Sequence, residues 1–340
     1  MKALVWNCQG AGSPLTIPQL KEACNLLSPN MVILCETKNR KQFMEKVQRK
    51  LRFEESVVVE SMNKSGGMAI FWNTEVKVLE VKTTAFTMEI HIMDTDHDVD
   101  WWFIGIYAST DDQIRRRQWE VVERRKILWG SRWVITGDFN DIISNEEKWG
   151  GRKREEGTFK YFRSFIEQNG LIDLGYEGNP WTWSNHWAQQ GKIKQRLDRS
   201  LASSDWSQIF DRTTVKHMEN FGSDHSMILL DSNPLQMKRK SRFLFDRRWL
   251  KKEGLQQVVK QEWEEEQSGS YMYKVHRKIA KCRLAILRWK NNFPGNARKK
   301  IKSLKKLLSD LQTSDCEDIR ERKKVLKMQL KEAYEEEELF

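Results

Sequence analysis

The chain has 340 residues, of which 39% are hydrophobic and 11% are aromatic. This is enough apolar material for a sizeable core, and it excludes wholesale disorder. No run approaches the roughly 18 apolar residues of a membrane span, and Met1 leads into a strand-like segment rather than a signal peptide. The five cysteines lack CxxC spacing, which predicts reduced thiols of an intracellular protein without disulfides or a zinc site.

The formal charge of +11 is distributed unevenly along the chain. Residues 1–230 carry 31 Lys and Arg against 31 Asp and Glu, whereas residues 231–340 carry 28 against 17. This asymmetry predicts a compact neutral domain followed by a basic extension that can hold a polyanion. The alternative is a solvated surface of Lys- and Glu-rich helices, which would produce the same counts.

Short apolar runs rich in β-branched and aromatic residues recur through the first part of the chain and predict strands. In chain order they are residues 3–6, 31–35, 68–72, 76–81, 88–93, 101–107 and 133–136. Helix-period segments lie between some of them, at residues 17–27, 38–51, 112–129 and 158–169. Further short strands are expected at residues 181–184, 195–201, 213–218 and 227–230. Strands punctuated by helices indicate stacked sheets flanked by helices.

The composition changes near Asn233-Pro234, and beyond this point the strand signal almost disappears. Leucines recur mostly at helical spacings among alternating Lys and Glu. Phe293-Pro294-Gly295 should divide this stretch into two helical pieces. We therefore predict one domain at residues 1–232 and a basic helical extension at residues 233–340.

Glu36 follows an apolar run that ends at Cys35, so it should lie at the carboxyl end of a strand. Catalytic groups commonly gather at such strand ends in open α/β sheets. Hydrolysis of a phosphodiester needs a divalent ion, and Mg²⁺ prefers hard oxygen ligands such as carboxylates. Glu36 is a candidate ligand on this argument, although a single Glu after a strand is ordinarily a solvated loop residue.

Asp138 and Asn140 follow another predicted strand. A spacing of two on an extended chain faces both side chains the same way, so the carboxylate can accept a proton from water that the amide orients. A simple turn is the competing interpretation, since Gly, Asp and Asn are favoured turn residues. Asp198 and His225 suit an Asp–imidazole pair, in which a protonated imidazole would stabilise phosphorane-like charge.

These residues belong to an ordered set of strings, each near an apolar run. The set is Asn7, Leu34-Cys35-Glu36-Thr37, Gly105-Ile106-Tyr107, Gly137-Asp138-Phe139-Asn140, Arg196-Leu197-Asp198-Arg199 and Ser223-Asp224-His225-Ser226. Over about residues 1–232 it resembles the endonuclease/exonuclease/phosphatase superfamily, most of all the apurinic-endonuclease-like domain of plant non-LTR (LINE-type) retrotransposon proteins. The resemblance implies an α/β fold (α+β type), a four-layer α/β sandwich of two packed mixed β-sheets flanked by helices, here followed by a helical C-terminal extension.

The resemblance also implies a catalytic set and a metal site. The catalytic set is Asn7, Glu36, Tyr107, Asp138, Asn140, Asp198, Asp224 and His225. Glu36 would be the principal Mg²⁺ ligand, with Asp138 and Asn140 on the metal side and Mn²⁺ as the alternative ion. Asp224 would support either the metal or the His225 side. Many relatives carry an acid two residues after the first Asn, where this chain has Gln9, and this departure weakens a second metal position.

Each remaining group has a role implied by the same resemblance. Asp138 would position or deprotonate the attacking water. Asn7 and Asn140 would orient phosphate and water. Tyr107 would contact the phosphate or the leaving group. Asp198 would pair with His225.

Two kinds of segment are candidate DNA contacts. In the resemblance, the segment from Pro180 into the loop 185–191 reaches the DNA groove, although a Trp such as Trp183 is more often part of the core. The basic clusters 115–117 and 152–154 could contact phosphates, unless they are merely solvated. The candidate DNA-binding residues are Arg115, Arg116, Arg152, Lys153, Trp183, Asn185 and Lys192.

The extension resembles the linker that follows the endonuclease in these retrotransposon proteins, and no aromatic-x-Asp-Asp string of a reverse transcriptase follows it. It is interpreted as a fragment truncated before the reverse transcriptase, whose basic helices could bind RNA or DNA. Lys238-Arg239-Lys240, together with a DNA substrate, favours the nucleus. No membrane partner and no particular oligomeric state are predicted.

The leading hypothesis is a Mg²⁺-dependent, retrotransposon-derived DNA endonuclease that makes single-strand nicks with 3′-hydroxyl ends. One alternative is a catalytically inactive retroelement relic that binds nucleic acid through residues 231–340. The other is a phosphatase or phospholipase on the same fold, because such relatives share the Gly-Asp-x-Asn and Ser-Asp-His strings. The basic tail and the Arg-Leu-Asp-Arg context favour DNA over these small substrates.

Overall fold

The computed structural model divides into two compact units, Met1–Gln236 and Met237–Phe340, each described here by itself. It describes residues 1–61, 66–185, 187, 191–219, 221–234, 245, 249–250, 253–266, 271–291, 297–311 and 317–338. Lys238-Arg239-Lys240 and the expected helix break at Phe293-Pro294-Gly295 lie outside the described residues.

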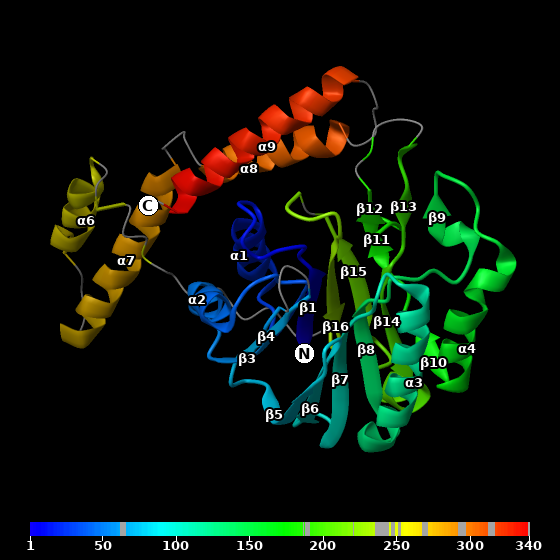
Figure 1. The fold of residues 1–340 in the computed structure, drawn as a ribbon. Coiled ribbons are helices and arrows are strands. Elements are labelled where there is room, and N and C mark those ends of the chain that lie inside the picture. The colour runs from blue at the N-terminus through cyan, green and yellow to red at the C-terminus, as the bar shows by residue number, and fades with distance from the viewer. Residues whose placement is uncertain are drawn as a thin grey trace. The chain divides into compact units, whose positions relative to one another are not determined.

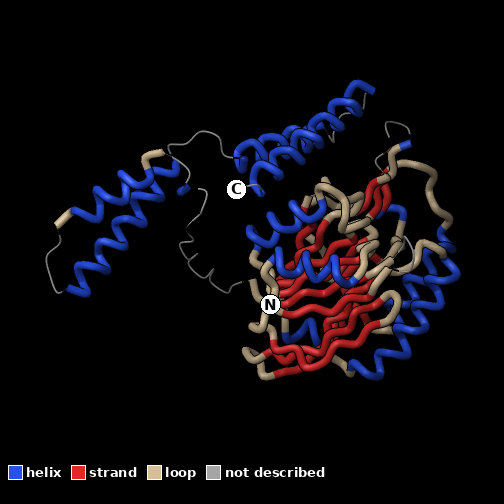
Figure 2. The backbone as a smooth tube through the Cα atoms, turned by 60° about the vertical axis from the view of Figure 1, so that its left-hand side comes forward, coloured by secondary structure: helices blue, strands red, loops and turns tan. Residues whose placement is uncertain are grey.

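Two large mixed sheets pack face to face in the first unit (Figures 1 and 2). In its described residues, the first sheet has the strand order β11 (Glu177–Gly178), β15 (Thr214–Met218), β16 (Met227–Asp231), β1 (Lys2–Asn7), β2 (Met31–Cys35), β4 (Met68–Trp72) and β3 (Glu55–Val59). β1 runs parallel to β2 and antiparallel to β16. β1 and β2 are buried on both faces, which explains their continuous apolar runs.

The second sheet places two candidate residues directly opposite each other. Its described strands follow the order β10 (Leu171–Asp173), β14 (Asp198–Ser203), β8 (Trp133–Asp138), β7 (Val99–Tyr107), β6 (Thr87–Asp94) and β5 (Lys77–Thr83). β7 and β8 are parallel, whereas β14 is antiparallel to β8. The register therefore pairs Asp198, the first residue of β14, with Asp138, the last residue of β8.

A small third sheet interrupts one predicted strand. Its order within the described residues is β12 (Trp183–Ser184), β13 (Lys194–Gln195) and β9 (Lys148–Trp149). The strand expected at residues 195–201 is divided between β13 and β14, because the two residues between them bond elsewhere. The Arg196 N–H donates to the Glu147 carbonyl, and the Leu197 N–H donates to Thr182 Oγ1.

Helices cover the outer faces of the two large sheets (Figure 1). The helices and 3₁₀ turns of this unit are α1 (Thr16–Leu27), α2 (Lys41–Leu51), α3 (Asp112–Trp129), η1 (Asn145–Glu147), η2 (Glu156–Phe159), α4 (Lys160–Gln168) and α5 (Ser204–Ile209). Leu20 of α1 and Met44 of α2 pack on the first sheet. Trp119 of α3 and Phe162 of α4 pack on the second.

The main core lies between the two sheets. Val5 and Ile33 of the first sheet meet Phe103 and Val134 of the second in one buried apolar cluster. Burying each such side chain contributes roughly 1.5–3 kcal/mol relative to leaving it in water. Helices, sheet, sheet and helices therefore form four layers, and the predicted four-layer α/β sandwich is confirmed.

One predicted helix begins later than expected, and one strand of the structure has no counterpart among the predicted elements. The helix expected from residue 38 begins only at Lys41, because Lys38 has a left-handed backbone with φ of +52°, which an α-helix cannot contain. Strand β3 was not predicted. It is an edge strand on β4 and is only half-buried or exposed, so it lacks a long apolar run.

The second unit is helical throughout its described residues. Its helices there are α6 (Leu255–Glu264), α7 (Tyr271–Asn291), α8 (Ala297–Asp310) and α9 (Glu317–Glu338). Leu255, Ile286 and Trp289 join α6 to α7, while Ile301 and Leu330 are buried in the pair α8 and α9. The predicted helical extension is confirmed, with more pieces than the two expected. Among the described residues, no helix combines the length and apolarity that crossing a membrane requires.

Candidate active site

The candidate catalytic side chains meet where strands of both large sheets end. Asn7 ends β1 and Asp138 ends β8, while Asp198 begins β14 opposite Asp138. His225 stands two residues before β16, which runs antiparallel to β1 and so begins at the same edge. The topology therefore brings together residues that are far apart in the sequence.

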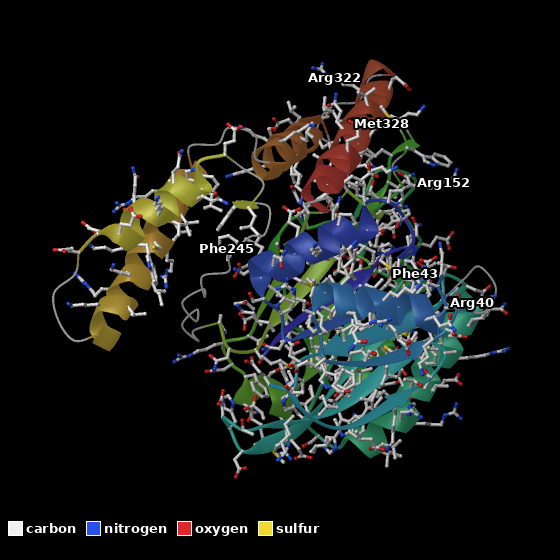
Figure 3. The ribbon with its side chains drawn as sticks, turned by 90° about the vertical axis from the view of Figure 1, so that its left-hand side faces the viewer. Arg40, Phe43, Arg152, Phe245, Arg322 and Met328 are labelled. Atoms are coloured by element: carbon white, nitrogen blue, oxygen red, sulfur yellow. The ribbon has the colours of Figure 1, made fainter. Side chains whose placement is uncertain are left out.

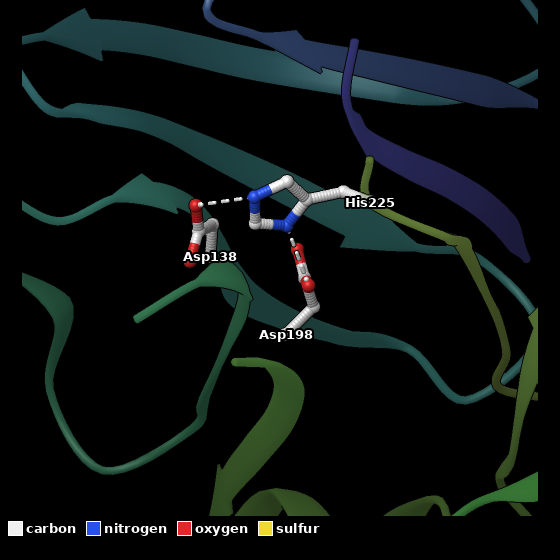
Figure 4. Close-up of side chains that lie close together, drawn as sticks. All are labelled: Asp138, Asp198 and His225. Carbon is white, nitrogen blue, oxygen red and sulfur yellow. Dashed lines mark hydrogen bonds and ion pairs between the residues drawn. The ribbon is translucent and has the colours of Figure 1, made fainter. Parts of the chain in front are cut away.

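A chain of hydrogen bonds and charges links four of these residues. His225 Nδ1 lies 2.9 Å from Asp198 Oδ2, and its Nε2 lies 3.6 Å from Asp138 Oδ2 (Figure 4). Asn7 Nδ2 donates to the same Asp138 oxygen at 2.9 Å. None of the four is more than 5% exposed. The imidazole is thus held between two carboxylates in a place from which bulk water is excluded.

Burial and charge set the protonation of this chain. Burial alone would lower the pKa of His225, but the carboxylates of Asp198 and Asp138 outweigh it and raise this pKa to about 10. Burial raises the pKa of the Asp138 carboxyl to about 7, against the lowering effect of His225. His225 is therefore protonated at neutral pH, with its Nδ1 hydrogen-bonded to Asp198 and its Nε2 facing Asp138.

A tight turn aims Asp138 into the site. The Asn140 N–H donates to Asp138 Oδ1 at 2.9 Å, and Asn140 Nδ2 donates to Asp138 Oδ2 at 3.1 Å and to the Ala108 carbonyl at 2.7 Å. A Cβ on Gly137, whose φ is +144°, would stand 2.2 Å from the Ile106 carbonyl oxygen, so only glycine fits there. Asp138 and Asn140 therefore form a turn, as one interpretation predicted, and this same turn points Asp138 into the candidate site.

Glu36 and Tyr107 form a second group at this edge. The Glu36 side chain is 17% exposed, and its Oε1 lies 2.9 Å from Lys38 Nζ. Tyr107, the last residue of β7, has a phenol that interacts with the Glu36 carboxylate. Burial first, and then the charges of Glu36 and Asp138, raise the pKa of the Tyr107 phenol above its ordinary value. Tyr107 therefore keeps its proton at neutral pH and is a hydrogen-bond donor.

Strained backbone is concentrated among these residues. Gln9, Glu36, Lys38 and Asn140 all have left-handed backbones, with φ between +48° and +53°. Each such non-glycine residue costs on the order of 1–3 kcal/mol, and clusters of them are typical of functional sites. The backbone bond from Gly10 N–H to the Glu36 carbonyl, at 2.9 Å, helps to hold the strained segments together.

Asp224 has a positioning role in this geometry. Its Oδ2 accepts from Gln9 Nε2 at 2.8 Å and from Trp183 Nε1 at 2.9 Å. The Ser223 hydroxyl beside it donates to the Asn7 carbonyl at 2.8 Å. One carboxylate oxygen of Asp224 therefore accepts from two protein donors. The role of Asp224 beside the metal or beside His225 stays a prediction.

The segment before the loop 185–191 supports the site rather than extending away from it. Thr182 Oγ1 accepts from the N–H groups of Leu197 and Asp198 at 3.0 and 2.9 Å. Trp183 pairs with His225 through an isolated β-bridge and packs beside Leu197 in a small apolar cluster. Trp183, expected as a DNA contact or a core residue, is thus half-buried and packed against the core, where it holds the His225 segment.

Of the arginines expected to contact DNA, Arg115 requires a correction. It is 5% exposed, and its Nε lies 3.2 Å from Asp141 Oδ2, so it is a buried structural ion pair. Arg116 is more exposed, but it pairs with Asp112 and its guanidinium lies 3.6 Å from the centre of the Tyr161 ring. Arg115 and Arg116 therefore mainly join helix α3 to Asp141 and Tyr161.

The remaining candidate DNA contacts divide by exposure. Arg152 and Lys153 are exposed, as the prediction requires. Lys192 is only 8% exposed. Asn185 donates to the Gly191 carbonyl at 2.8 Å and so ties together the two ends of the loop. Lys192 is therefore buried, and Asn185 stabilises the loop, so neither presents its side chain at the surface as the prediction requires.

A divalent ion fits Glu36 best. Asp138, Asp198 and His225 offer atoms within 4.8 Å of one another, which is close enough to hold a metal ion. However, all three side chains are buried, His225 lies 2.9 Å from Asp198, and Asp138 accepts from Asn7 at 2.9 Å. Glu36 is a hard oxygen donor that is partly exposed and already attracts a cation, the Lys38 ammonium. These properties match the ligands that Mg²⁺ prefers.

Sequence reasoning missed two residues that shape the site. Lys38 stands two residues after Glu36, outside a helix, and this spacing could have indicated its contact with the carboxylate. Thr182 carries no local signal, because the backbone groups that it holds lie 15 and 16 residues further along the chain.

A four-layer α/β sandwich with carboxylates, an amide and an imidazole gathered at one sheet edge defines a class of metal-dependent phosphoesterases. The chain belongs to the Endonuclease/Exonuclease/phosphatase family, whose sequence profile matches residues 4–225. Members of this family are typically metal-dependent nucleases or phosphatases. Among curated proteins, none matches the sequence.

Several solved structures share the fold at low sequence identity. The AP endonuclease from Archaeoglobus fulgidus has a TM-score of 0.55 at 14% identity, over 68% of this chain and 98% of that one. The 3′-5′ exonuclease NExo from Neisseria meningitidis has a TM-score of 0.52 at 17% identity, over 68% and 99%. The endonuclease domain of TRAS1, a telomere-specific non-LTR retrotransposon, has a TM-score of 0.51 at 15% identity, over 68% and 97%.

Proposed function

We propose that this protein is a Mg²⁺-dependent DNA endonuclease that nicks one strand and leaves a 3′-hydroxyl end. The observation that carries the proposal is the buried chain of Asn7, Asp138, His225 and Asp198 beside the partly exposed Glu36. Family membership adds support, because this constellation lies at the strand ends of a domain typical of nucleases and phosphatases.

Each residue has a task in phosphodiester hydrolysis. Asp138 accepts a proton from the attacking water, and a pKa near neutrality suits that task. Asn7 holds Asp138 in place, while the protonated His225 stabilises negative charge that develops on the phosphoryl oxygens. Asp198 orients the imidazole and keeps it charged. Tyr107 donates a hydrogen bond from its phenol to a phosphate oxygen or to the leaving 3′-oxygen, which takes up a proton from solvent to become the 3′-hydroxyl. When bound at Glu36, a divalent ion supplies Lewis-acid neutralisation of the phosphate.

We further propose a retrotransposon origin and a nuclear location. The ordered strings support this origin, and the fold shared with the TRAS1 endonuclease domain is consistent with it. In this proposal residues 1–232 are the catalytic domain. Residues 233–340 are a basic linker whose helices contact DNA or RNA, for which the excess of 28 Lys and Arg over 17 Asp and Glu in residues 231–340 is the support.

Nicking of supercoiled plasmid tests the proposed function. We expect relaxed circles with Mg²⁺, none with EDTA, and a loss of roughly a thousandfold in Glu36→Ala, since a metal ion stabilises the transition state by several kcal/mol. Glu55→Ala, which removes an exposed carboxylate at the start of β3, should nick like the unmodified protein. Extension of the nicks by a DNA polymerase would show the 3′-hydroxyl. Intact plasmid from folded protein would favour the inactive relic, and faster phosphate release from small phosphoesters would favour a phosphatase.

The nicking rate is expected to have a bell-shaped dependence on pH. Asp138 must be ionised to accept a proton, so its raised pKa should reduce the rate as the pH falls below about 7. His225 must be protonated, so its raised pKa should maintain the rate until the pH rises through about 10. Asp198→Asn removes the largest charge that raises the pKa of His225 and should move the alkaline limb to lower pH. An alkaline limb that stays in place would contradict the role given to Asp198.

A further inference from the structure

A cavity of about 590 Å³ opens beside the candidate active site, at the start of α2. Lys38, Arg40, Phe43 and Lys46 are among its lining residues. Figure 3 labels Arg40, which directly precedes this helix, and Phe43, which lies in its first turn. Lys38 belongs to both places, because it lines the cavity and its Nζ lies 2.9 Å from Glu36 Oε1. The cavity and the candidate metal ligand are therefore neighbours, with Lys38 in contact with both.

The lining of this cavity is positively charged. Lys38, Arg40 and Lys46 contribute three cations, of which Lys38 is paired with Glu36, and none of the lining residues is acidic. Arg40 and Lys46 are exposed, and neither forms an ion pair within the part of the chain that the structure describes. The neighbouring Lys41, in contrast, lies 4.0 Å from Glu45. Cations that gather in a concave surface without carboxylates create a potential that attracts anions.

We infer that this cavity binds backbone phosphates of the nucleic acid strand next to the bond that is cut, an inference that rests on the proposed function. The volume of about 590 Å³ is far larger than a single phosphate ion needs, and it suits a segment of a phosphodiester chain. The guanidinium of Arg40 can hold a phosphate through two parallel hydrogen bonds, and Lys46 adds a point charge. Such contacts position the strand without reading its sequence.

Binding of a short DNA duplex, measured by fluorescence anisotropy in EDTA, tests this inference. The double variant Arg40→Gln/Lys46→Gln should bind about tenfold more weakly, with a salt dependence reduced by about two counterions. The charge-matched control Arg49→Gln/Lys50→Gln removes two exposed cations from the last turn of the same helix, away from the cavity lining, and should stay within about twofold. Where nicking occurs, the cavity variant should raise KM and leave kcat unchanged.

Equal losses in the two double variants, or no loss in the cavity variant, would overturn the inference. Inorganic phosphate and a nucleoside monophosphate serve as competitors that separate a free phosphate compound from a strand. If either displaced DNA at micromolar concentration from the unmodified protein, the cavity would be a site for a small phosphate compound instead. Because binding is measured without metal, a protein that nicks nothing but binds DNA through Arg40 and Lys46 would refute the proposed function and leave the phosphate site standing.

Discussion

Replacement of His225 by alanine is expected to reduce plasmid nicking by roughly a thousandfold, within the range lost when a positioned charge-stabilising group is removed. The imidazole is the charged link between Asp198 and Asp138, at 2.9 and 3.6 Å. Its removal takes away the group that stabilises developing charge and also leaves two buried carboxylates without their cation. Single-turnover nicking at saturating DNA would measure the loss, and thermal unfolding would show that the variant folds.

Two further variants make the result specific. His97→Ala removes a partly exposed histidine that pairs with Asp94, outside the candidate site, and should nick at the normal rate. Asp198→Asn keeps the shape of the pair but lowers the pKa of His225. The loss of nicking should therefore lie between those of His97→Ala and His225→Ala. If His225→Ala retained more than a tenth of the activity, His225 would be a structural histidine rather than a catalytic one.

Replacement of Arg199 by leucine is expected to lower the free energy of unfolding by about 3–5 kcal/mol, the usual cost of removing one partner of a buried ion pair. Arg199 is fully buried, and it lies 2.7 Å from Glu147 Oε2 and 3.2 Å from Asp173 Oδ2. Burial would raise the pKa of Asp173, but the neighbouring Arg196 and Arg199 together lower it. Without Arg199, both carboxylates would lose much of their compensating charge. Unfolding in urea, followed by circular dichroism, measures the change.

Arg163→Leu is the matched control for this stability prediction. Arg163 pairs with Glu156 at the surface, where its side chain is 43% exposed, so its loss should cost at most about 1 kcal/mol. Similar costs for the two arginines would mean that water screens the Arg199 network and that it contributes little to the fold. Because Arg199 directly follows Asp198, this network also fixes where β14 begins and hence where Asp198 lies.

The expected sandwich rested on patterns that neighbouring residues create by themselves. Strands buried on both faces, such as β1 and β2, must be apolar along their whole length, so their runs were visible before any packing was known. The candidate residues Asn7, Glu36 and Asp138 stand where those runs stop. The ends of these strands were therefore predictable, and so was the position of the candidate residues at those ends.

The roles of basic residues were less predictable, because they depend on which face of an element packs against its neighbours. Within the arginine cluster of α3, Arg115 is buried against Asp141, a partner 26 residues away, whereas Arg116 stays at the surface. The sequence shows three equivalent arginines there. Lys38 was expected inside a helix, yet its left-handed backbone leaves it beside Glu36 and at the cavity that α2 lines.

By itself, the sequence determined which strands form and which acids, amides and imidazole follow them, because side-chain alternation and apolar runs are local properties. Only the tertiary structure decided how these groups are charged and held. The high pKa of His225 and the raised pKa of Asp138 come from burial and from carboxylates that the chain brings in from positions 138 and 198. Contacts between residues so far apart depend on sheet order and register, which no local pattern records.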